Sequence, residues 1–561
     1  KLSFKNVITF NLDEYYNISK DEPQSYSVFM NNHLFSQIDI PKKNINIPNG
    51  KTKEKDIIDY CKDYEKKIID CGGIDFQLLG IGRTAHIGFN EPGSNKNSVT
   101  RLIALDSITR LDAANAFNGL SMVPEKAITM GIGTIMNAKR IVLLAWGHTK
   151  SNIVSRTIEG EISSSAPATF LQNHQNTTFI LDEEASADLT KFKTPWLVKE
   201  FTWNDALKKK AIVWLSKKLN KPVLKLTQRD YNKNGLANLI ANQGNVYDLN
   251  IWIFNELQKT ITGWPGGKPY HDDSNRPERA NPPKKKVLIF SPHPDDDVIS
   301  MGGTYARLID QGHEVHVAYQ TSGNIAVSDE EAIKFLDVMY SFAESNPKDI
   351  KIKDLKNQLI NKKNDEADPK KIMKLKGLIR KNECIAAGRF LKLPEKNLHF
   401  LNLPFYETGF IKKNEPTKND INITVDLINK IKPHQIFAAG DLADPHGTHR
   451  ICLDILFNAI KLLKNKNYMK NCWMWLYRGA WEEWEIENIE MAIPMSPAQV
   501  LQKRNSILFH QSQKDKVMFQ GNDEREFWLR AEERNKKTAK LYNKLGLAEY
   551  EAIEGFKRFY F

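Results

Sequence analysis

The feature that most constrains this chain is an apolar run, Val287 to Phe290, followed at once by the string Ser-Pro-His-Pro-Asp-Asp-Asp. A β-rich run that ends in one imidazole and three carboxylates predicts a strand of an open α/β sheet, because ligands bind at the carboxyl ends of such strands. A catalytic divalent metal needs a neutral imidazole and ionised carboxylates, with one position left open for water. His293 and Asp296 can turn toward one ion, which leaves Asp295 to act as a base.

A second polar string follows another predicted strand, Gln435 to Ala439. His446 and His449 stand three residues apart there, on a segment that contains Gly and Pro. One histidine can bind a metal, and the other can donate a hydrogen bond to a developing oxyanion. Taken alone, His-x-x-His favours a surface loop. Its pairing with the string after Phe290, at the end of another strand, favours a functional site.

The composition bounds the class of protein. The chain has 561 residues, of which 41% are hydrophobic and 26% charged, as in soluble globular proteins of two to four domains. It has no run of about 18 apolar residues, so we expect no membrane span. The five cysteines are scattered and form no Cys-x-x-Cys pair, which favours a reducing, cytoplasmic setting. The net charge of +12 comes mostly from dispersed Lys without a nucleic-acid-binding pattern, so we expect no nucleic-acid partner.

Strand-like runs alternate with helical patterns in two parts of the chain, which predicts two α/β domains with doubly wound, mostly parallel, Rossmann-like sheets. We expect the first at residues 1–190 and the second at 286–561, joined at 191–285 by a mainly helical connector and a Gly/Pro-rich linker. The chain begins with Lys1 and enters a strand-like run almost at once, so we expect an N-terminal unit to be missing. The Lys-rich stretch 350–381 has helical periodicity and predicts a solvated helix or hairpin.

The first predicted domain has its own polar string. A glycine turn follows the run Phe76 to Leu79, and His86 and Glu91 come next, five residues apart. They can form a base and the carboxylate that orients it. Ala85 interrupts the G-x-G-x-x-G pattern, so a dinucleotide site is not predicted. Upstream, Asp13 ends another strand-like run, and taken alone it favours a turn or helix-cap residue.

Residues 286–561 resemble the LmbE/PIG-L family of zinc-dependent N-acetylglucosamine deacetylases. The resemblance is carried by His-Pro-Asp-Asp, Gly302-Gly303, Arg380-x-x-Glu383, Phe400-Leu401-x-Leu403-Pro404, the His-x-x-His pair and His510-Gln511-Ser512-Gln513. It implies zinc as cofactor, with three ligands: His293, Asp296 and His449. It further implies Asp295 as general base, and His446 as the group that stabilises the oxyanion or protonates the leaving amine. Arg380 and Glu383 equally predict an ordinary i,i+3 salt bridge, and His510 has no assigned role.

Residues 1 to about 185 resemble the glucosamine-6-phosphate deaminase/isomerase family. The strings Phe-Asn-Leu-Asp-Glu-Tyr, Gly-Ile-Gly-x-x-x-His-Ile-x-Phe-Asn-Glu-Pro, Ser-Ile-Thr-Arg and Ala-Ile-Thr-Met-Gly-Ile-Gly-Thr carry the resemblance in order. It implies that Asp13 moves a proton between C2 and C1 of the open-chain sugar. His86, oriented by Glu91, would assist ring opening, and Arg110 would contact the substrate phosphate. Thr84 stands where the family has a carboxylate or amide beside the histidine, and Asn176 stands where it has a phosphate-binding lysine.

Two functions remain open at this point. In the first, the chain is a hydrolase of amino-sugar metabolism that removes acetate from an N-acetylglucosamine derivative and then ammonia from glucosamine 6-phosphate, yielding fructose 6-phosphate. In the second, the N-terminal domain is a non-catalytic sugar-phosphate-binding module attached to a deacetylase, and Thr84 and Asn176 favour this. Both predict a small amino sugar or its phosphate as partner, and both leave a homo-oligomer open.

Overall fold

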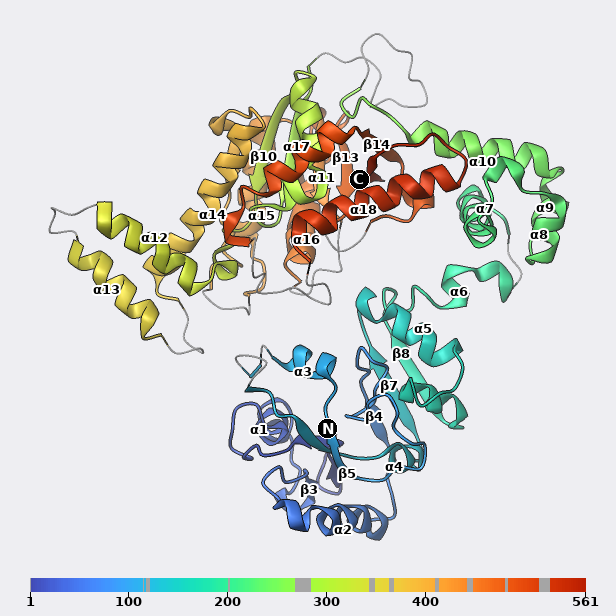
Figure 1. Cartoon of the computed structure of the whole chain (residues 1–561), viewed down its shortest axis with the longest axis vertical. Helices are drawn as coiled ribbons and strands as arrows, with labels where there is room; N and C mark the ends of the chain where they lie inside the picture. The colour runs from blue at the N-terminus through green and yellow to red at the C-terminus, as the bar shows by residue number, and fades with distance from the viewer. Residues whose placement is uncertain are drawn as a thin grey trace. The chain divides into compact units, whose positions relative to one another are not determined.

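The computed structural model describes residues 2–114, 116–117, 122–199, 202–267, 284–342, 349–362, 368–408, 413–440, 447–479, 483–513 and 525–561. The chain divides into two compact units, Lys1–Phe201 and Thr202–Phe561 (Figure 1). Both units are mixed α/β structures with parallel strands, as the sequence predicts. Within the segment 191–285 that the sequence predicts as a connector, residues from 202 onward group with the second unit.

The first unit contains a parallel sheet of order β4-β7-β8, an antiparallel sheet of order β2-β6-β5, and the parallel pair β1-β3. The parallel sheet follows the predicted alternation, whereas the antiparallel one was not predicted. The strands are β1 (Thr9–Phe10), β2 (Asp13–Tyr15), β3 (Ile45–Asn46), β4 (Gln77–Leu79), β5 (Arg101–Ala104), β6 (Lys126–Thr129), β7 (Ile141–Ala145) and β8 (Thr177–Leu181).

Helices pack on the parallel sheet of the first unit and bury its apolar face. Leu79 of β4 and Leu143 of β7 lie in one cluster with Ile68, Ile135 and Val154 from three helices. The helices are α1 (Tyr26–His33), α2 (Ile57–Asp70), α3 (Ser107–Ala113), α4 (Ile132–Met136), α5 (Ser151–Glu159) and α6 (Thr190–Lys193).

The second unit is built on a seven-stranded sheet of order β11-β10-β9-β12-β13-β15-β14. The first five strands in this order pair in parallel, and β15 pairs antiparallel with β13 and β14. Strands β10 and β11 lie on one side of β9, and β12 and β13 lie on the other. The order of the strands therefore reverses between β9 and β12, which makes this gap a topological switch point. The strands are β9 (Lys286–Ser291), β10 (Glu314–Tyr319), β11 (Leu398–Phe400), β12 (Gln435–Ala439), β13 (Trp473–Tyr477), β14 (Met491–Met495) and β15 (Ala552–Phe559).

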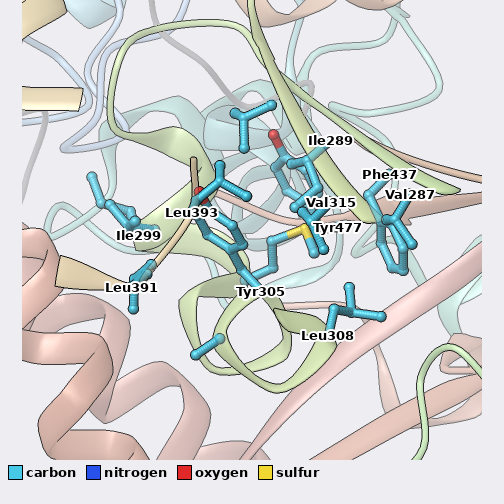
Figure 2. Close-up of a cluster of buried hydrophobic side chains, with 14 of the residues drawn as sticks. Val287, Ile289, Ile299, Tyr305, Leu308, Val315, Leu391, Leu393, Phe437 and Tyr477 are labelled. Carbon is cyan, nitrogen blue, oxygen red and sulfur yellow. The ribbon is translucent and has the colours of Figure 1, made fainter. Parts of the chain in front are cut away.

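Both faces of β9 are buried, which explains why its sequence is a continuous apolar run. Val287 and Ile289 point into a cluster with Tyr305 and Leu308 of α11, as Figure 2 shows. Leu288 and Phe290 belong to a separate cluster whose other members include residues of α15 and α16. The helices of this unit are α7 (Asp205–Leu219), α8 (Gln228–Lys233), α9 (Ala237–Gln243), α10 (Val246–Thr260), α11 (Asp296–Asp310), α12 (Asp329–Phe342), α13 (Asp349–Ile360), α14 (Lys370–Phe390), α15 (Lys418–Ile431), α16 (Thr448–Leu463), α17 (Pro497–Ile507) and α18 (Phe527–Lys544).

The Lys-rich stretch 350–381 forms α13 and the start of α14. The prediction of a solvated helix is wrong for one face of α14, because Lys376 and Arg380 are only 3% and 1% exposed. The ammonium group of Lys376 forms ion pairs with two carboxylates, those of Asp329 and Asp368. Composition alone could not reveal that these cations have buried partners. No described helix is long and apolar enough to cross a membrane.

A buried ion pair lies under the start of α11. This helix has a non-helical residue at Met301, so the amides that follow lack their usual helical partners. Glu554 of β15 accepts hydrogen bonds from the amides of Gly303 and Thr304, at 3.0 and 2.7 Å, and pairs with Lys503 at 2.7 Å. Lys503 also packs beside Gly302, where an added Cβ would lie 3.0 Å from its Cγ. Glu554 therefore joins the helix that starts at the polar string to β15, the strand next to the β14 edge of the sheet.

Replacing Glu554 with Gln should destabilise the second unit by about 3–5 kcal/mol, because Lys503 would stay buried without its counter-charge. Hydrogen exchange of peptides from α11 and β15, measured in increasing urea, reports this free energy of unfolding. The same replacement at the exposed Glu549 should change it by less than about 0.5 kcal/mol. Equal effects at the two positions would contradict a structural role for the pair.

Candidate functional site

The polar string of the second unit forms a tight loop between β9 and α11. The backbone amide of His293 donates to the Asp296 carboxylate at 2.8 Å, and the Asp295 amide donates to the His293 carbonyl at 2.9 Å. Asp295 adopts a positive φ of 155°, in a region that residues with a side chain rarely occupy. The loop thereby turns His293 and Asp296 to one side and Asp295 to another.

Three candidate metal ligands meet at the switch point of the sheet. His449 lies at the start of α16, after β12, and its Nε2 is 3.2 Å from both Asp296 Oδ2 and His293 Nδ1. The distance from His293 Nδ1 to Asp296 Oδ2 is also 3.2 Å. Two ligands at 2.0–2.1 Å from a tetrahedral zinc lie about 3.3 Å apart, so the spacing of this triangle fits three ligands of one zinc ion. The three residues predicted as ligands are thus the ones that the fold brings together.

Asp295 pairs with a buried cation instead of joining the ligand triangle. Arg380 of α14 places Nη2 3.0 Å from Asp295 Oδ1 and donates to the Pro294 carbonyl at 2.6 Å. Burial raises the pKa of Asp295 to about 8, against the opposing effect of the Arg380 charge. For Asp296, burial alone would raise the pKa, but the imidazoles of His449 and His293 lower it below its usual range. The surroundings therefore raise the pKa of Asp295 and lower the pKa of Asp296, its neighbour in the sequence.

Arg380 and Glu383 have separate roles in positioning this site, and their contact with each other is long, at 4.0 Å. Glu383 instead accepts hydrogen bonds from the backbone amide and hydroxyl of Ser512, at 2.6 and 2.8 Å. This contact fixes the string that contains His510, a buried residue that lines a small cavity together with Asp295. Burial lowers the pKa of His510 to about 3, so its imidazole is neutral near pH 7.

Asp297 lies behind the loop and makes no part of the ligand triangle. Its carboxylate accepts a hydrogen bond from the Tyr319 hydroxyl at 3.0 Å, and its amide donates to Ser291 Oγ at 3.0 Å. Burial raises its pKa to about 7. The residue therefore joins β9, β10 and α11 beneath the site. His446, the predicted oxyanion or leaving-group residue, lies outside the described residues.

The first unit brings His86 and Glu91 together, as the sequence predicts. His86 Nδ1 lies 3.1 Å from Glu91 Oε2, and both side chains are largely buried, at 14% and 12% exposed. Two hydroxyls complete the cluster: Thr84 Oγ1 is 2.8 Å and Thr109 Oγ1 3.4 Å from the same imidazole nitrogen. Burial tends to raise the pKa of Glu91, but the hydrogen bond and charge of His86 outweigh it, so the pKa falls below its usual value.

Asp13 lies on β2, paired with Thr129 of β6, beside the loop that carries His86. Gly88 has a positive φ of 55°, and a Cβ there would come within 3.0 Å of the Thr129 hydroxyl and 3.3 Å of an Asp13 oxygen. Glycine thus lets this loop approach the carboxylate. Burial, aided by the charge of Glu14, raises the pKa of Asp13 to about 7.

Two cationic side chains, those of Arg110 and Lys150, make backbone contacts near this cluster. Arg110 follows Thr109 on α3, but its Nη2 donates to the Val123 carbonyl at 3.2 Å. Lys150, which sequence reasoning missed, donates to the Ile81 carbonyl at 2.9 Å, in the glycine turn before His86. Burial lowers its pKa. The signal that could have found Lys150 is a glycine turn and a lysine just after β7, at the same sheet edge as the turn after β4.

Two family profiles match the chain. Residues 288–460 match GlcNAc-PI de-N-acetylase, or PIG-L, and residues 1–180 match the glucosamine-6-phosphate isomerases/6-phosphogluconolactonase. The first match spans the ligand triangle, and the second spans the His86–Glu91 cluster. The two profiles correspond to the two families that the motifs resemble.

The chain is also similar to individual proteins, over different shares of its length. A glucosamine-6-phosphate deaminase-like protein of Bacteroides thetaiotaomicron is 52% identical over 563 residues, covering 99% of this chain and 85% of the relative. A glucosamine-6-phosphate deaminase of Clostridium botulinum is 47% identical over 189 residues, 34% of this chain and 77% of that protein. A solved monomeric glucosamine-6-phosphate deaminase is 43% identical over 33% of this chain and 77% of its own, with a TM-score of 0.33.

We expect purified protein to hold one divalent cation per chain, and His449→Ala or Asp296→Ala to lose most of it, because each removes one of three ligands. Metal analysis of protein purified without chelators measures the stoichiometry. His33→Ala, at an exposed position of α1 in the other unit, is the control and should leave it unchanged. Equal metal content in all three variants would contradict this site.

Proposed function

This chain belongs to the family of glucosamine-6-phosphate deaminase-like proteins, and on that basis we propose that it is a two-site enzyme of amino-sugar metabolism. In this proposal the second unit removes acetate from an N-acetylglucosamine derivative, with zinc as cofactor. The first unit then converts glucosamine 6-phosphate to fructose 6-phosphate and ammonia. The observation that carries the proposal is the ligand triangle of His293, Asp296 and His449, with Asp295 beside it, inside the region that matches PIG-L.

Deacetylation consumes one water and yields acetate and a free amine. A zinc ion bound by the triangle would supply the Lewis acidity that polarises the acetamide carbonyl and activates the water. Asp295, positioned by Arg380, takes the proton of the attacking water. His446 stabilises the developing oxyanion or delivers a proton to the leaving amine, so that the C–N bond breaks without forming an amide anion. Because this step is a hydrolysis, we propose that the second unit is a hydrolase.

Deamination in the first unit requires proton transfer and ring opening. We assign the transfer of a proton from C2 to C1 of the open-chain sugar to Asp13, and ring opening to His86 oriented by Glu91. This proton shift leaves an imine at C2. Water adds to that carbon and ammonia leaves, which gives the ketose. Arg110 is proposed for the substrate phosphate by resemblance, and Lys150 adds a second cation at the glycine turn. The substrates are small amino sugars, and a cytoplasmic setting remains part of the proposal.

A second function is favoured by specific residues. Thr84 contacts His86 where the related enzymes have a carboxylate or amide, and a neutral hydroxyl stabilises an imidazolium less than a carboxylate does. Asn176 is the other departure, and its amide instead donates to the Lys139 carbonyl. The first unit would then bind a sugar phosphate without turning it over.

The two functions are separated by measuring acetate and ammonia on the same samples. With N-acetylglucosamine, free and phosphorylated, Asp295→Asn should lower acetate release by about 10²–10⁴-fold, because it removes the general base. With glucosamine 6-phosphate, Asp13→Asn should lower ammonia release by a similar factor. The exposed replacements Asp310→Asn and Asp21→Asn are the matched controls. Ammonia release that equals the Asp13→Asn level would reject the deaminase and favour the binding module.

The deaminase activity should also fall in acid. Asp13 must be ionised to accept a proton, and its pKa is raised to about 7. Its basic form is therefore complete only above pH 7, and kcat/KM should drop about tenfold for each pH unit below it. A pH profile of ammonia release with glucosamine 6-phosphate measures this. A rate that is constant between pH 5 and 7 would contradict Asp13 as the base.

A further inference from the structure

A large cavity opens beside the ligand triangle, at the carboxyl ends of β9, β10 and β11. Its volume is about 680 Å³, within the usual range for small-molecule sites. Pro294, between two residues of the polar string, forms part of its wall, and Ser322 and Asn402 line it after the neighbouring strands. A molecule in this cavity therefore borders the loop that carries Asp295.

One face of α14 forms the opposite wall. Lys370, Lys374 and Lys381 all line the cavity, and their spacing of four and seven residues places them on the same side of the helix. Gly377 lies between them, and a Cβ there would be 3.4 Å from the Ser322 side chain, so the helix runs close to the end of β10. Three ammonium groups thus share one wall.

The charges in this wall are unbalanced. The structure gives Lys370 and Lys374 no ion pair with any described residue, and Lys381 lies over the Phe400 ring at 4.9 Å. Asp368 also lines the cavity, but its carboxylate is paired with Lys362 and Lys376. Asp368 therefore does not neutralise the charges of the three lysines in this wall.

The other side of the cavity has an acceptor that lacks a donor. Glu407 accepts a hydrogen bond from the Asn324 amide at 2.8 Å through Oε2. Its Oε1 is buried and has no hydrogen-bond partner among the described residues. A buried carboxylate oxygen costs free energy unless it is paired, and a ligand hydroxyl can pair with it. The cavity thus combines a place for hydroxyl donors with a place for an anion.

We propose that this cavity binds the substrate of the second unit and that this substrate is a phosphate monoester of an N-acetylated sugar. The sugar hydroxyls donate to Glu407, and the phosphate lies against Lys370, Lys374 and Lys381, whose ammonium groups act as compact donors. The inference rests on the proposed deacetylation, for which it names the substrate class. The product is then an amino-sugar phosphate, the class of compound on which the first unit is proposed to act.

The test compares N-acetylglucosamine with its 6-phosphate and its 1-phosphate as substrates for acetate release. Wild-type protein should have a lower KM for one phosphate than for the neutral sugar. The variant with all three lysines replaced by Gln should raise that KM by about tenfold or more, as the loss of charge-assisted hydrogen bonds predicts. Its KM for the neutral sugar should change by less than about twofold, and its metal content should be that of wild type.

Single replacements provide the matched control. Lys374→Gln should raise the KM for the phosphate, whereas Lys371→Gln, the same change at an exposed position of α14 outside the cavity, should not. A phosphate KM that is equal in wild type, the triple variant and Lys371→Gln would overturn the inference. A neutral sugar that is preferred over both phosphates would overturn it as well.

Failure of the proposed function gives a different result. If no substrate releases acetate, deacetylation is rejected, and titration calorimetry of the two N-acetylated sugar phosphates decides the binding site alone. A difference in binding between wild type and the triple lysine variant isolates this cavity, because the replaced residues all belong to the second unit. Binding that is lost in the triple variant supports the inference, and binding that is absent or unchanged overturns it.

Discussion

The pairing of β9 with β10 on one side and with β12 on the other is the constraint on which the second site depends. Ile289 pairs with Phe437 of β12, so the ends of two strands that are far apart in sequence lie next to each other. His293 and His449 approach to 3.2 Å for that reason. The same position requires β9 to be apolar on both faces, because residues of α11 cover one side and residues of α15 and α16 the other. Core and candidate metal site are therefore consequences of one strand order.

Two neighbouring carboxylates acquire different chemistry from their surroundings alone. Asp296 faces two imidazoles, which lower its pKa and suit a ligand. Asp295 is buried, faces the guanidinium of Arg380, and has a raised pKa. Pairs of groups whose surroundings push their pKa values apart divide acid–base roles between them. Arg380 itself is fixed by the Pro294 carbonyl, so the helix that forms the lysine wall of the cavity also orients the proposed base.

The sequence predicts those residues of this site that a local pattern marks. A strand end marks His293 and Asp296, and a second strand end marks His449. It could not predict Glu554, whose contact with Gly303 spans 251 residues, because no local pattern records which distant carboxylate satisfies the amides of a kinked helix. Lys376 was missed for a related reason, since a lysine that is paired in the interior looks the same in sequence as one in water. The sequence does not predict the antiparallel β2-β6-β5 sheet. An alternation of strands and helices indicates where strands occur, but it says less about which strands pair and in which direction.

The candidate site of the first unit is centred on His86. Its imidazole has one carboxylate partner, Glu91, and two neutral hydroxyl partners, Thr84 and Thr109. A hydroxyl can accept a hydrogen bond from an imidazolium but brings no negative charge, so Glu91 alone must stabilise the protonated form. The proposed deamination also needs a base for the C2 proton, a step separate from the ring opening that is proposed for His86. Asp13 is the residue that we propose for this step, because a buried carboxylate with a pKa raised to about 7 is a stronger base than an exposed one. In the proposed mechanism, turnover in this unit therefore depends on Asp13 as well as on the histidine cluster.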